Sequence, residues 1–360
     1  MTAGSEPKAI TPTQGAGTVR VSVIIKALNE ERHIDAAIRS ALAALQEIGG
    51  EVILADSGSN DRTVEIARQH PITIVQLKNP VERCCGIGPQ LGFQLARGEF
   101  VYILDGDMEL DPLFLPAALA ALAADIQLGG VGGLVEEESN ASYQFRGRKR
   151  RGSEGIARQC KWLDMGGLYR ATALHAVGYF SNRNLHAYEE MDLGLRLGVR
   201  GWTLRRIAVR SVLHHGRSEG NWILLSRRWR SRYLNGAGEL LRAAVGRRYF
   251  LRAASTQRHL IIGLLIWGGL IGGLLLLPLT PWLLMATLIG VIGLVLVRAV
   301  RTGSIADACF GQIVWQVTSL AMVRGFFGQQ RDPMEPIEYL LLKRPPYADQ
   351  PGQPAHPDQS

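Results

Sequence analysis

Apolar and polar positions follow two different periods in turn along residues 21–107. The run at 21–27 (VSVIIKA) is rich in β-branched residues, whereas 33–48 carries apolar residues at helical spacing. The same alternation continues downstream in segments at 51–57, 60–70, 72–77, 88–98 and 100–107. Strands and helices that alternate at this spacing form a parallel sheet with helices on its faces. The pattern therefore predicts an α/β, Rossmann-like domain.

A long apolar block lies in the second half of the chain. Residues 260–297 contain no charged side chain. A single helix of that length would measure about 57 Å, nearly twice the thickness of a bilayer's hydrocarbon core. Pro278 and Pro281 interrupt the block near its middle. We therefore expect a transmembrane hairpin of two helices, at about 260–277 and 282–299.

Arginines surround this hairpin unevenly. Arg258 precedes it and Arg298 and Arg301 follow it, while the central turn has no basic residue. The positive-inside rule then places the α/β domain and the C-terminal tail in the cytoplasm, with a multi-pass anchor in the inner (plasma) membrane. Residues 221–259 mix many arginines with Trp, Tyr and Leu, a pattern typical of amphipathic helices on an anionic membrane surface.

The rest of the chain completes the expected organisation. The segment 304–327 is apolar but contains Arg324; we favour an interfacial or re-entrant helix, with a third membrane span as the alternative. The predicted units are a disordered leader (1–19), the α/β domain (20–220), basic amphipathic juxtamembrane helices (221–259), two transmembrane helices (260–300), an interfacial or re-entrant helix with a cytoplasmic segment (301–344) and a disordered tail (345–360).

The composition indicates an anionic partner. The 360 residues are 47% hydrophobic and carry a net charge of +8, which excludes an intrinsically disordered chain. A positive balance fits nucleic acid, phosphorylated substrates or a lipid surface. We expect no nucleic acid partner, because aspartates gathered at strand ends would repel its phosphates.

Polar residues follow three of the predicted strands. Asn29 and Glu30 follow the first, Asp56 ends the second, and Asp105 and Asp107 end the fourth. Ligands of parallel sheets bind beyond the carboxyl ends of the strands, so these side chains should share one rim. Two carboxylates separated by one glycine can hold Mg²⁺ or Mn²⁺ against a substrate's phosphates. A solvated turn is the alternative for the Asp-Gly-Asp sequence.

Several motifs together resemble a known family. In order they are VSVIIKALNEERHI, LADSGSNDRTVEIA, LARGEFVYILDGDMEL, GGLYRATALHAVGYF and EEMDLGLRL. This set is similar to family 2 inverting glycosyltransferases with the A-type nucleotide-sugar fold, over about residues 21–216. The C-terminal hairpin resembles that of membrane-anchored bacterial members.

The resemblance implies roles on the donor side. Asn29 and Glu30 match the family's first-strand motif, with Glu30 near the ribose. Asp56 matches an aspartate that pairs with the edge of the base, which favours a UDP-sugar over a GDP-sugar. Asp105 and Asp107 match the motif that binds the diphosphate and a Mg²⁺ or Mn²⁺ ion, and His214 matches a histidine beside that metal.

The resemblance also implies a base and an acceptor side. Glu190 stands where the family commonly has its basic aspartate, and Glu189 or Asp192 could share the role. A carboxylate is needed there because a sugar hydroxyl is a poor nucleophile until its proton is removed. An acidic pair that simply starts a helix is the alternative. Arg228 and Trp229 partly match an acceptor motif.

A basic loop adds further candidates for an acceptor's phosphate. Arg148 and Arg150 lie in a cluster of basic residues that could bind such a group; a solvated loop is the alternative. We expect a membrane-anchored, metal-dependent inverting glycosyltransferase of cell-envelope polysaccharide biosynthesis. It would move a sugar from a nucleotide donor to a lipid-linked or cell-surface saccharide. A polyprenyl-phosphate glycosyltransferase is the alternative, followed by a non-catalytic membrane scaffold.

Overall fold

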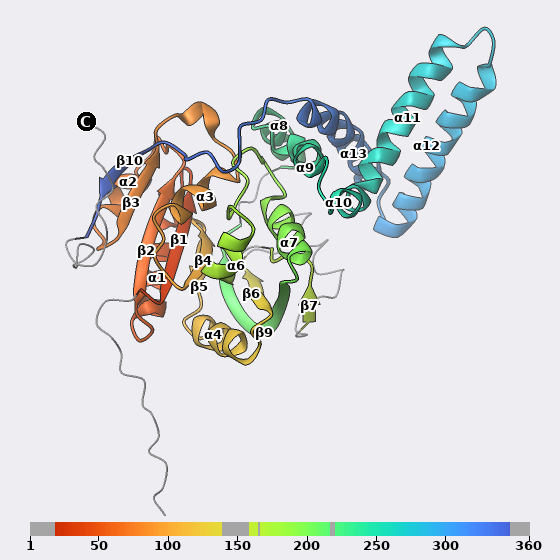
Figure 1. The fold of residues 1–360 in the computed structure, drawn as a ribbon. Coiled ribbons are helices and arrows are strands. Elements are labelled where there is room, and N and C mark those ends of the chain that lie inside the picture. The colour runs from red at the N-terminus through yellow and green to blue at the C-terminus, as the bar shows by residue number, and fades with distance from the viewer. Residues whose placement is uncertain (1–18, 139–157, 165, 217–219, 346–360) are drawn as a thin grey trace, which may run out of the picture.

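A mixed ten-stranded sheet forms the centre of the molecule in the computed structural model (Figure 1), which describes residues 19–138, 158–164, 166–216 and 220–345. The strand order is β10-β3-β2-β1-β4-β8-β6-β9-β5, and β7 pairs with β9. The predicted leader and tail lie almost entirely outside the described residues, as do Arg148 and Arg150.

The parallel half of the sheet agrees with the sequence pattern. Its strands are β1 (Val21–Ala27), β2 (Gly50–Asp56), β3 (Thr73–Leu77) and β4 (Phe100–Asp105). The connecting helices are α1 (Ile34–Leu45), α2 (Thr63–Ala67) and α3 (Ile87–Phe93). α2 and α3 are shorter than predicted; before α2 the Asp61 carboxylate accepts a hydrogen bond from the Thr63 amide, which favours a turn over a helix there.

The order of these strands creates a place for a ligand. The chain runs from β1 through β2 to β3 on one side, and then crosses to place β4 on the other side of β1. Such a topological switch opens a crevice beyond the carboxyl ends of the two diverging strands. In the register of β1 and β4, Lys26 is the direct partner of Asp105.

Two apolar cores cover the two faces of the sheet. Val23 and Ile25 of β1 face the core formed with α1 and α4 (Phe114–Ala124), while Ile24 faces the other core. This alternation follows from the two-residue period of a strand. The second core also contains residues of α3, α6 (Ala171–Ala176) and α7 (Glu189–Val199).

The second half of the sheet brings two further strand ends to the same rim. Its strands are β5 (Met108–Leu110), β6 (Leu128–Glu137), β7 (Arg158–Cys160), β8 (Gly167–Arg170) and β9 (Thr203–His214). β6 and β9 run parallel and end together, with Glu137 opposite His214. β5 pairs with the end of β9 and places Met108 opposite His214. Glu137 and His214 therefore lie near the turn that follows β4.

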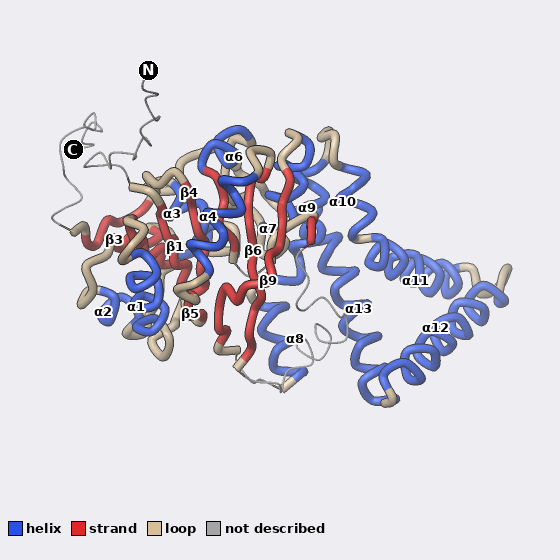
Figure 2. Tube along the Cα trace, turned by 90° about the horizontal axis from the view of Figure 1, so that it is seen from below, coloured by secondary structure: helices blue, strands red, loops and turns tan. Residues whose placement is uncertain are grey.

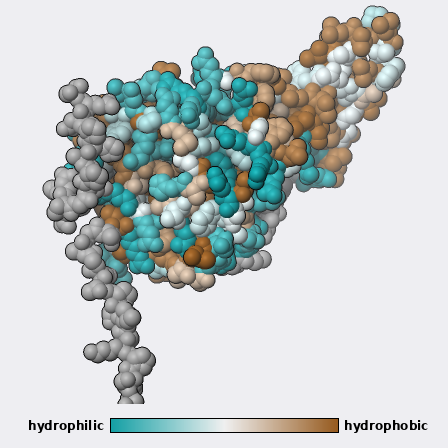
Figure 3. Space-filling model, viewed as in Figure 1, coloured by the Kyte–Doolittle hydropathy of each residue, from teal (hydrophilic) through white to brown (hydrophobic). Residues whose placement is uncertain are grey.

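A helical region connects the sheet to an apolar hairpin. It contains α8 (Asn221–Arg230), the 3₁₀ helix η2 (Tyr233–Asn235), α9 (Gly236–Ala244) and α10 (Phe250–Thr256). The hairpin that follows consists of α11 (Arg258–Leu275) and α12 (Pro281–Thr302). Both are long and apolar enough to cross a membrane, and little of either is buried. They project from the domain with an apolar surface (Figure 3), as the sequence predicted.

The chain after the hairpin returns to the sheet. α13 (Ile305–Phe326) packs against α9 and the hairpin (Figure 2). β10 (Tyr339–Lys343), which the sequence did not predict, then pairs antiparallel with β3 at the sheet edge. Because β1 and β10 belong to one sheet, the chain between them must cross any membrane an even number of times. This result excludes α13 as a third complete span after two crossings by α11 and α12.

Candidate active site

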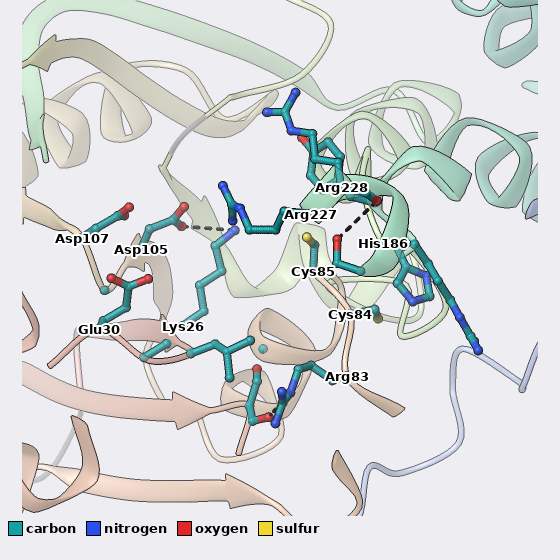
Figure 4. A pocket seen from close by; sticks show the side chains of 18 of the residues that line it. Lys26, Glu30, Arg83, Cys84, Cys85, Asp105, Asp107, His186, Arg227 and Arg228 are labelled. Carbon is teal, nitrogen blue, oxygen red and sulfur yellow. Dashed lines mark hydrogen bonds and ion pairs between the residues drawn. The ribbon is translucent and has the colours of Figure 1, made fainter. Parts of the chain in front are cut away.

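A cavity of about 830 Å³ lies at the carboxyl ends of β1 and β4, within the range of roughly 300–1,000 Å³ typical of small-molecule sites. Its sheet side carries mostly acidic groups, and its other side carries arginines of α8 and of the turn that follows it (Figure 4). The charged residues on the sheet side are Lys26, Glu30, Arg83, Asp105, Asp107, Glu137 and His214, and those on the helical side are Arg227, Arg228, Arg230 and Arg232.

Asp105, Asp107 and His214 all line this cavity, and their predicted role as metal ligands stays a prediction. Asp105 ends β4, and Asp107 follows after a tight turn at Gly106. A Cβ atom at Gly106 would lie 3.0 Å from Cγ of Glu30, so a glycine leaves room for Glu30 beside the turn. Oδ2 of Asp107 lies 3.5 Å from Nε2 of His214.

His214 is held by a second carboxylate that the sequence analysis missed. Nδ1 of His214 lies 2.7 Å from Oε2 of Glu137. Burial lowers the pKa of His214, but the hydrogen bonds to Asp107 and Glu137 outweigh it and raise the pKa to about 10. A histidine oriented by a carboxylate through one nitrogen is common among metal ligands. The register of β6 and β9 creates this pair, and no motif marked Glu137.

The donor types in this cluster fit a hard divalent ion, because carboxylate oxygens and an oriented imidazole suit Mg²⁺ or Mn²⁺. Within the described residues, however, no three His, Cys, Asp or Glu side chains converge as a ready metal site. Asp105 pairs instead with Lys26 (Figure 4).

Lys26 is the main cation on the sheet side of the site, and the sequence analysis did not identify it. Its Nζ lies 3.1 Å from Oδ1 of Asp105 and 3.4 Å from Oε1 of Glu189. Burial lowers the pKa of Lys26, but the charges of Asp105 and Glu189 raise it well above its ordinary value. Lys26 is therefore protonated at neutral pH.

Glu189 and Glu190 occupy the first turn of α7, close to Lys26. Tyr188, just before the helix, has a φ of 70°, a strained conformation for a bulky residue. Burial and the charge of Glu189 raise the pKa of Glu190 to about 8, although Lys26 opposes the shift. The described residues that line the cavity include Lys26 but neither glutamate.

Asp192 does not join this cluster. Its side chain is fully buried, and its carboxylate accepts a hydrogen bond of 2.8 Å from Arg196 one turn further along α7. Arg196 also donates to the backbone oxygens of Tyr179 and Phe180. This geometry assigns Asp192 to anchoring the helix, so its predicted catalytic role is not carried further.

Asn29 and Asp56 shape the loops above β1 and β2. Oδ1 of Asn29 accepts a hydrogen bond from the Asn60 amide, which ties the two loops together. Asp56 is fully buried and accepts hydrogen bonds from the amides of Gly58 and Ser59 and from the side chains of Ser59 and Gln76. Its predicted contact with a nucleotide base stays a prediction.

Arg83 is a further cavity residue that the sequence analysis missed. Its guanidinium donates hydrogen bonds of 2.9 Å and 2.7 Å to the backbone oxygens of Ser57 and Gly58. Gly58 has a φ of 86°, which a glycine adopts without strain. Arg83 therefore fixes the loop that follows Asp56 at one border of the cavity.

The two residues of the predicted acceptor motif separate in the structure. Arg228 lines the cavity, with its guanidinium carbon 4.9 Å from the centroid of the Tyr233 ring. Trp229 lies instead under the guanidinium of Arg324 on α13, at 4.5 Å. The helical spacing of adjacent residues explains the difference, because neighbours on a helix point about 100° apart.

Comparison with known proteins agrees with this arrangement. A model described as "Glycosyl transferase family 2" matches residues 22–174, and one described as "Glycosyl transferase family group 2" matches residues 100–300. The chain belongs to glycosyl transferase family group 2. This glycosyltransferase resembles a mannosyltransferase from Pyrobaculum calidifontis, with a TM-score of 0.53, 18% identity and 86% of each chain covered.

Two curated relatives each match about a third of this chain or less. One is an undecaprenyl-phosphate 4-deoxy-4-formamido-L-arabinose transferase from Pectobacterium atrosepticum, 35% identical over 105 residues, which cover 27% of this chain and 31% of the relative. The other is a dolichol-phosphate mannosyltransferase from Pyrococcus furiosus, 28% identical over 127 residues, covering 33% and 36%. The chain thus spans about a third of the length of these relatives.

Proposed function

We propose that this glycosyltransferase moves a sugar from a nucleotide-sugar donor to the phosphate of a membrane lipid of the polyprenyl class. The observation that carries the proposal is the distribution of charge in one cavity, which has acidic groups on one side and arginines on the other. Its sheet side presents Asp105 and Asp107, while its other side presents Arg227 and Arg228 of α8. α8 begins the helical region that leads into the apolar hairpin.

The sheet side is the proposed donor site. Mg²⁺ or Mn²⁺ bound by Asp105, Asp107 and His214 would neutralise the donor's diphosphate and so stabilise the leaving group. Glu137 would orient His214, and Glu30 would accept hydrogen bonds from the ribose. The structurally similar mannosyltransferase was solved in complex with GDP-Man and Mn²⁺. The nucleotide we favour here is UDP.

The arginine side is the proposed acceptor site. Guanidinium groups bind phosphate with bidentate hydrogen bonds and stay charged at every physiological pH. The matched relatives act on undecaprenyl phosphate and dolichol phosphate, according to their names. In the proposed reaction an acceptor phosphate oxygen forms a bond to the anomeric carbon, the bond from that carbon to the diphosphate breaks, and the anomeric configuration inverts.

A second acceptor, the hydroxyl of a lipid-linked or cell-surface saccharide, is favoured by Glu190. Its pKa of about 8 suits a general base near neutral pH. In this reaction Glu190 accepts the hydroxyl proton while the oxygen attacks the anomeric carbon. An acceptor phosphate is already ionised and needs no base, so the two reactions differ in their need for Glu190.

The proposed location is the cytoplasmic side of the inner membrane, with α11 and α12 as a two-span anchor. At 1.5 Å per residue the two helices measure about 27 Å and 33 Å, close to the hydrocarbon thickness of about 30 Å. Arg258, Arg298 and Arg301 lie at the end of the hairpin nearest the sheet domain, which the positive-inside rule assigns to the cytoplasm.

The proposal is tested with the purified full chain in liposomes that contain undecaprenyl phosphate. A panel of radiolabelled UDP- and GDP-sugars is added with MnCl₂, and label entering the lipid fraction is counted. We expect transfer from at least one donor, its loss with EDTA, and a loss of at least about 100-fold in Asp107→Asn. Asp125→Asn, which changes a carboxylate paired with Arg205 away from the cavity, should keep full activity. Absence of transfer from every donor in the panel would contradict the proposal and is the result expected of a non-catalytic scaffold.

A further inference from the structure

Lys26 lies between the two groups of carboxylates of the site. It is the register partner of Asp105 on the adjacent strand, and its ammonium contacts Asp105 at 3.1 Å and Glu189 at 3.4 Å. Figure 4 shows its side chain rising from β1 toward Asp105 at the floor of the cavity. A Cβ atom at Gly88 of α3 would come within 2.9 Å of Cβ of Lys26, so the glycine leaves the lysine the space to rise there.

The carboxylates around this ammonium need a positive charge. Asp105 comes from β4, and Glu189 and Glu190 come from the first turn of α7. Like charges that are partly removed from water repel one another strongly. The backbone before α7 is also strained at Tyr188, so the start of this helix depends on favourable contacts nearby. Lys26 supplies such a contact to Glu189 and links α7 to the centre of the sheet.

The ammonium of Lys26 pairs with the Asp105 carboxylate, which the divalent ion needs as a ligand. Oδ1 of Asp105 faces Lys26, while Asp107 faces His214. An ion that binds both aspartates must therefore replace the ammonium at Asp105 or share the carboxylate with it. Two cations at one carboxylate repel each other, so binding of the ion and pairing with Lys26 oppose one another.

We propose that Lys26 is a positioning residue that competes with the divalent ion for Asp105. Without the ion, Lys26 holds Asp105 and Glu189 in place; with the ion bound, Glu189 remains its partner and α7 keeps its position. The inference rests on the proposed function, because it concerns the same metal and donor site. A lysine that only stabilised the fold would not weaken metal binding.

The test measures Mn²⁺ affinity without nucleotide, from the loss of the free Mn²⁺ signal in electron paramagnetic resonance titrations of the purified full chain. We expect Lys26→Met to bind Mn²⁺ at least about tenfold more tightly than the wild type, because a nearby positive charge is removed. The same variant should lose sugar transfer, since α7 loses its link to β1. Lys26→Arg should restore both properties toward wild-type values.

Matched controls separate this effect from general changes. Lys161→Met removes an exposed lysine outside the cavity and should leave Mn²⁺ affinity unchanged. Asp105→Asn should bind Mn²⁺ more weakly than the wild type, which locates the ion at Asp105. Thermal unfolding shows whether each variant is folded; Lys26→Gln, which keeps a polar side chain, replaces Lys26→Met if that variant does not fold.

Two failures remain distinguishable. If the wild type binds Mn²⁺ no better than Asp105→Asn, the proposed metal site is wrong and the role of Lys26 is wrong with it. If the wild type binds better than Asp105→Asn, but folded Lys26→Met or Lys26→Gln shows unchanged or weaker affinity, only the inference about Lys26 is overturned.

Discussion

Arg183 and Glu82 form an ion pair of 2.5 Å that connects the C-terminal segment to the border of the cavity. The Arg183 side chain is 3% exposed and also donates hydrogen bonds to the backbone oxygens of Glu335 and Pro336, just before β10. Glu82 ends the 3₁₀ helix η1 (Pro80–Glu82), directly before Arg83. The buried guanidinium of Arg183 therefore links the segment before β10 to η1 at the border of the cavity.

Arg183→Gln should destabilise the fold markedly. The change removes the more buried of the two arginines that pair with Glu82, which keeps Arg331 and the Asn79 side chain as partners at 3.1 Å. It also removes the hydrogen bonds that hold the segment just before β10. Losing the hydrogen bonds of a buried charged group costs about 1.5–3 kcal/mol, so the midpoint of thermal unfolding should fall by roughly 3–12 °C. Arg62→Gln, which removes an exposed pair with Glu65, should change the midpoint by less than about 2 °C. Equal midpoints for the two variants would contradict this role.

The return of β10 to the sheet predicts the membrane topology. Since β1 and β10 share a sheet, β10 and the glycosyltransferase domain must lie on the same side of the membrane. A green fluorescent protein fused after Ser360 should fluoresce in the cytoplasm. A cysteine at Leu279, which is 79% exposed in the turn between α11 and α12, should react with a membrane-impermeant maleimide in spheroplasts, in a background that lacks the native cysteines. Labelling only after lysis would show that the turn does not cross.

Glu190→Gln decides between the two acceptors and has a second effect on stability. With a hydroxyl acceptor, Glu190 must be deprotonated, so wild-type transfer should rise with pH up to about 8 and the variant should lose at least about 100-fold. With a phosphate acceptor, the variant should keep most of its activity and the rise should be absent. The measurement is the pH profile of kcat for both proteins at saturating donor.

The raised pKa of Glu190 also makes the native state less stable at alkaline pH. A group that binds its proton more tightly when folded contributes stability at low pH, and this stability is lost as pH rises from the ordinary value of 4.5 to about 8. Glu190→Gln should therefore unfold at a temperature roughly 3–8 °C above the wild type at pH 9. The difference should shrink toward pH 5. A constant difference across this range would contradict the assignment.

Arg228→Gln tests the arginine side of the cavity. If Arg228 binds an acceptor phosphate, the KM for the lipid acceptor should rise about tenfold while the KM for the donor changes little. The comparison variant is Arg324→Gln, whose arginine packs on Trp229 on the other side of α8. An equal rise in both KM values for Arg228→Gln would show that this arginine acts on the donor or on the fold.

The local pattern of the sequence predicted the strands and the hairpin well. β1 covers the residues VSVIIKA that the pattern predicted as a strand. The proline-containing interruption of the apolar block forms the turn before Pro281. Both predictions depend on neighbours in the chain: the period of apolar residues fixes a strand or helix, and a proline at the first position of a helix starts it. β10 was missed because a short apolar run shows no such period, and only the free edge of β3 makes it a strand.

The sequence by itself determined which carboxylates stand at strand ends, because a motif and the strand before it are contiguous in the chain. Asp105, Asp107 and His214, which it singled out, all line one cavity, and their role as metal ligands stays a prediction. Only the tertiary structure decided that Glu137 orients His214, that Asp192 is taken by Arg196, and that Lys26 separates Asp105 from Glu189. The partners of His214 and Lys26 come from different elements, whereas Asp192 and Arg196 lie one turn apart on the same buried face of α7. These pairings follow from strand register and helix packing, which depend on long-range contacts that no local pattern specifies.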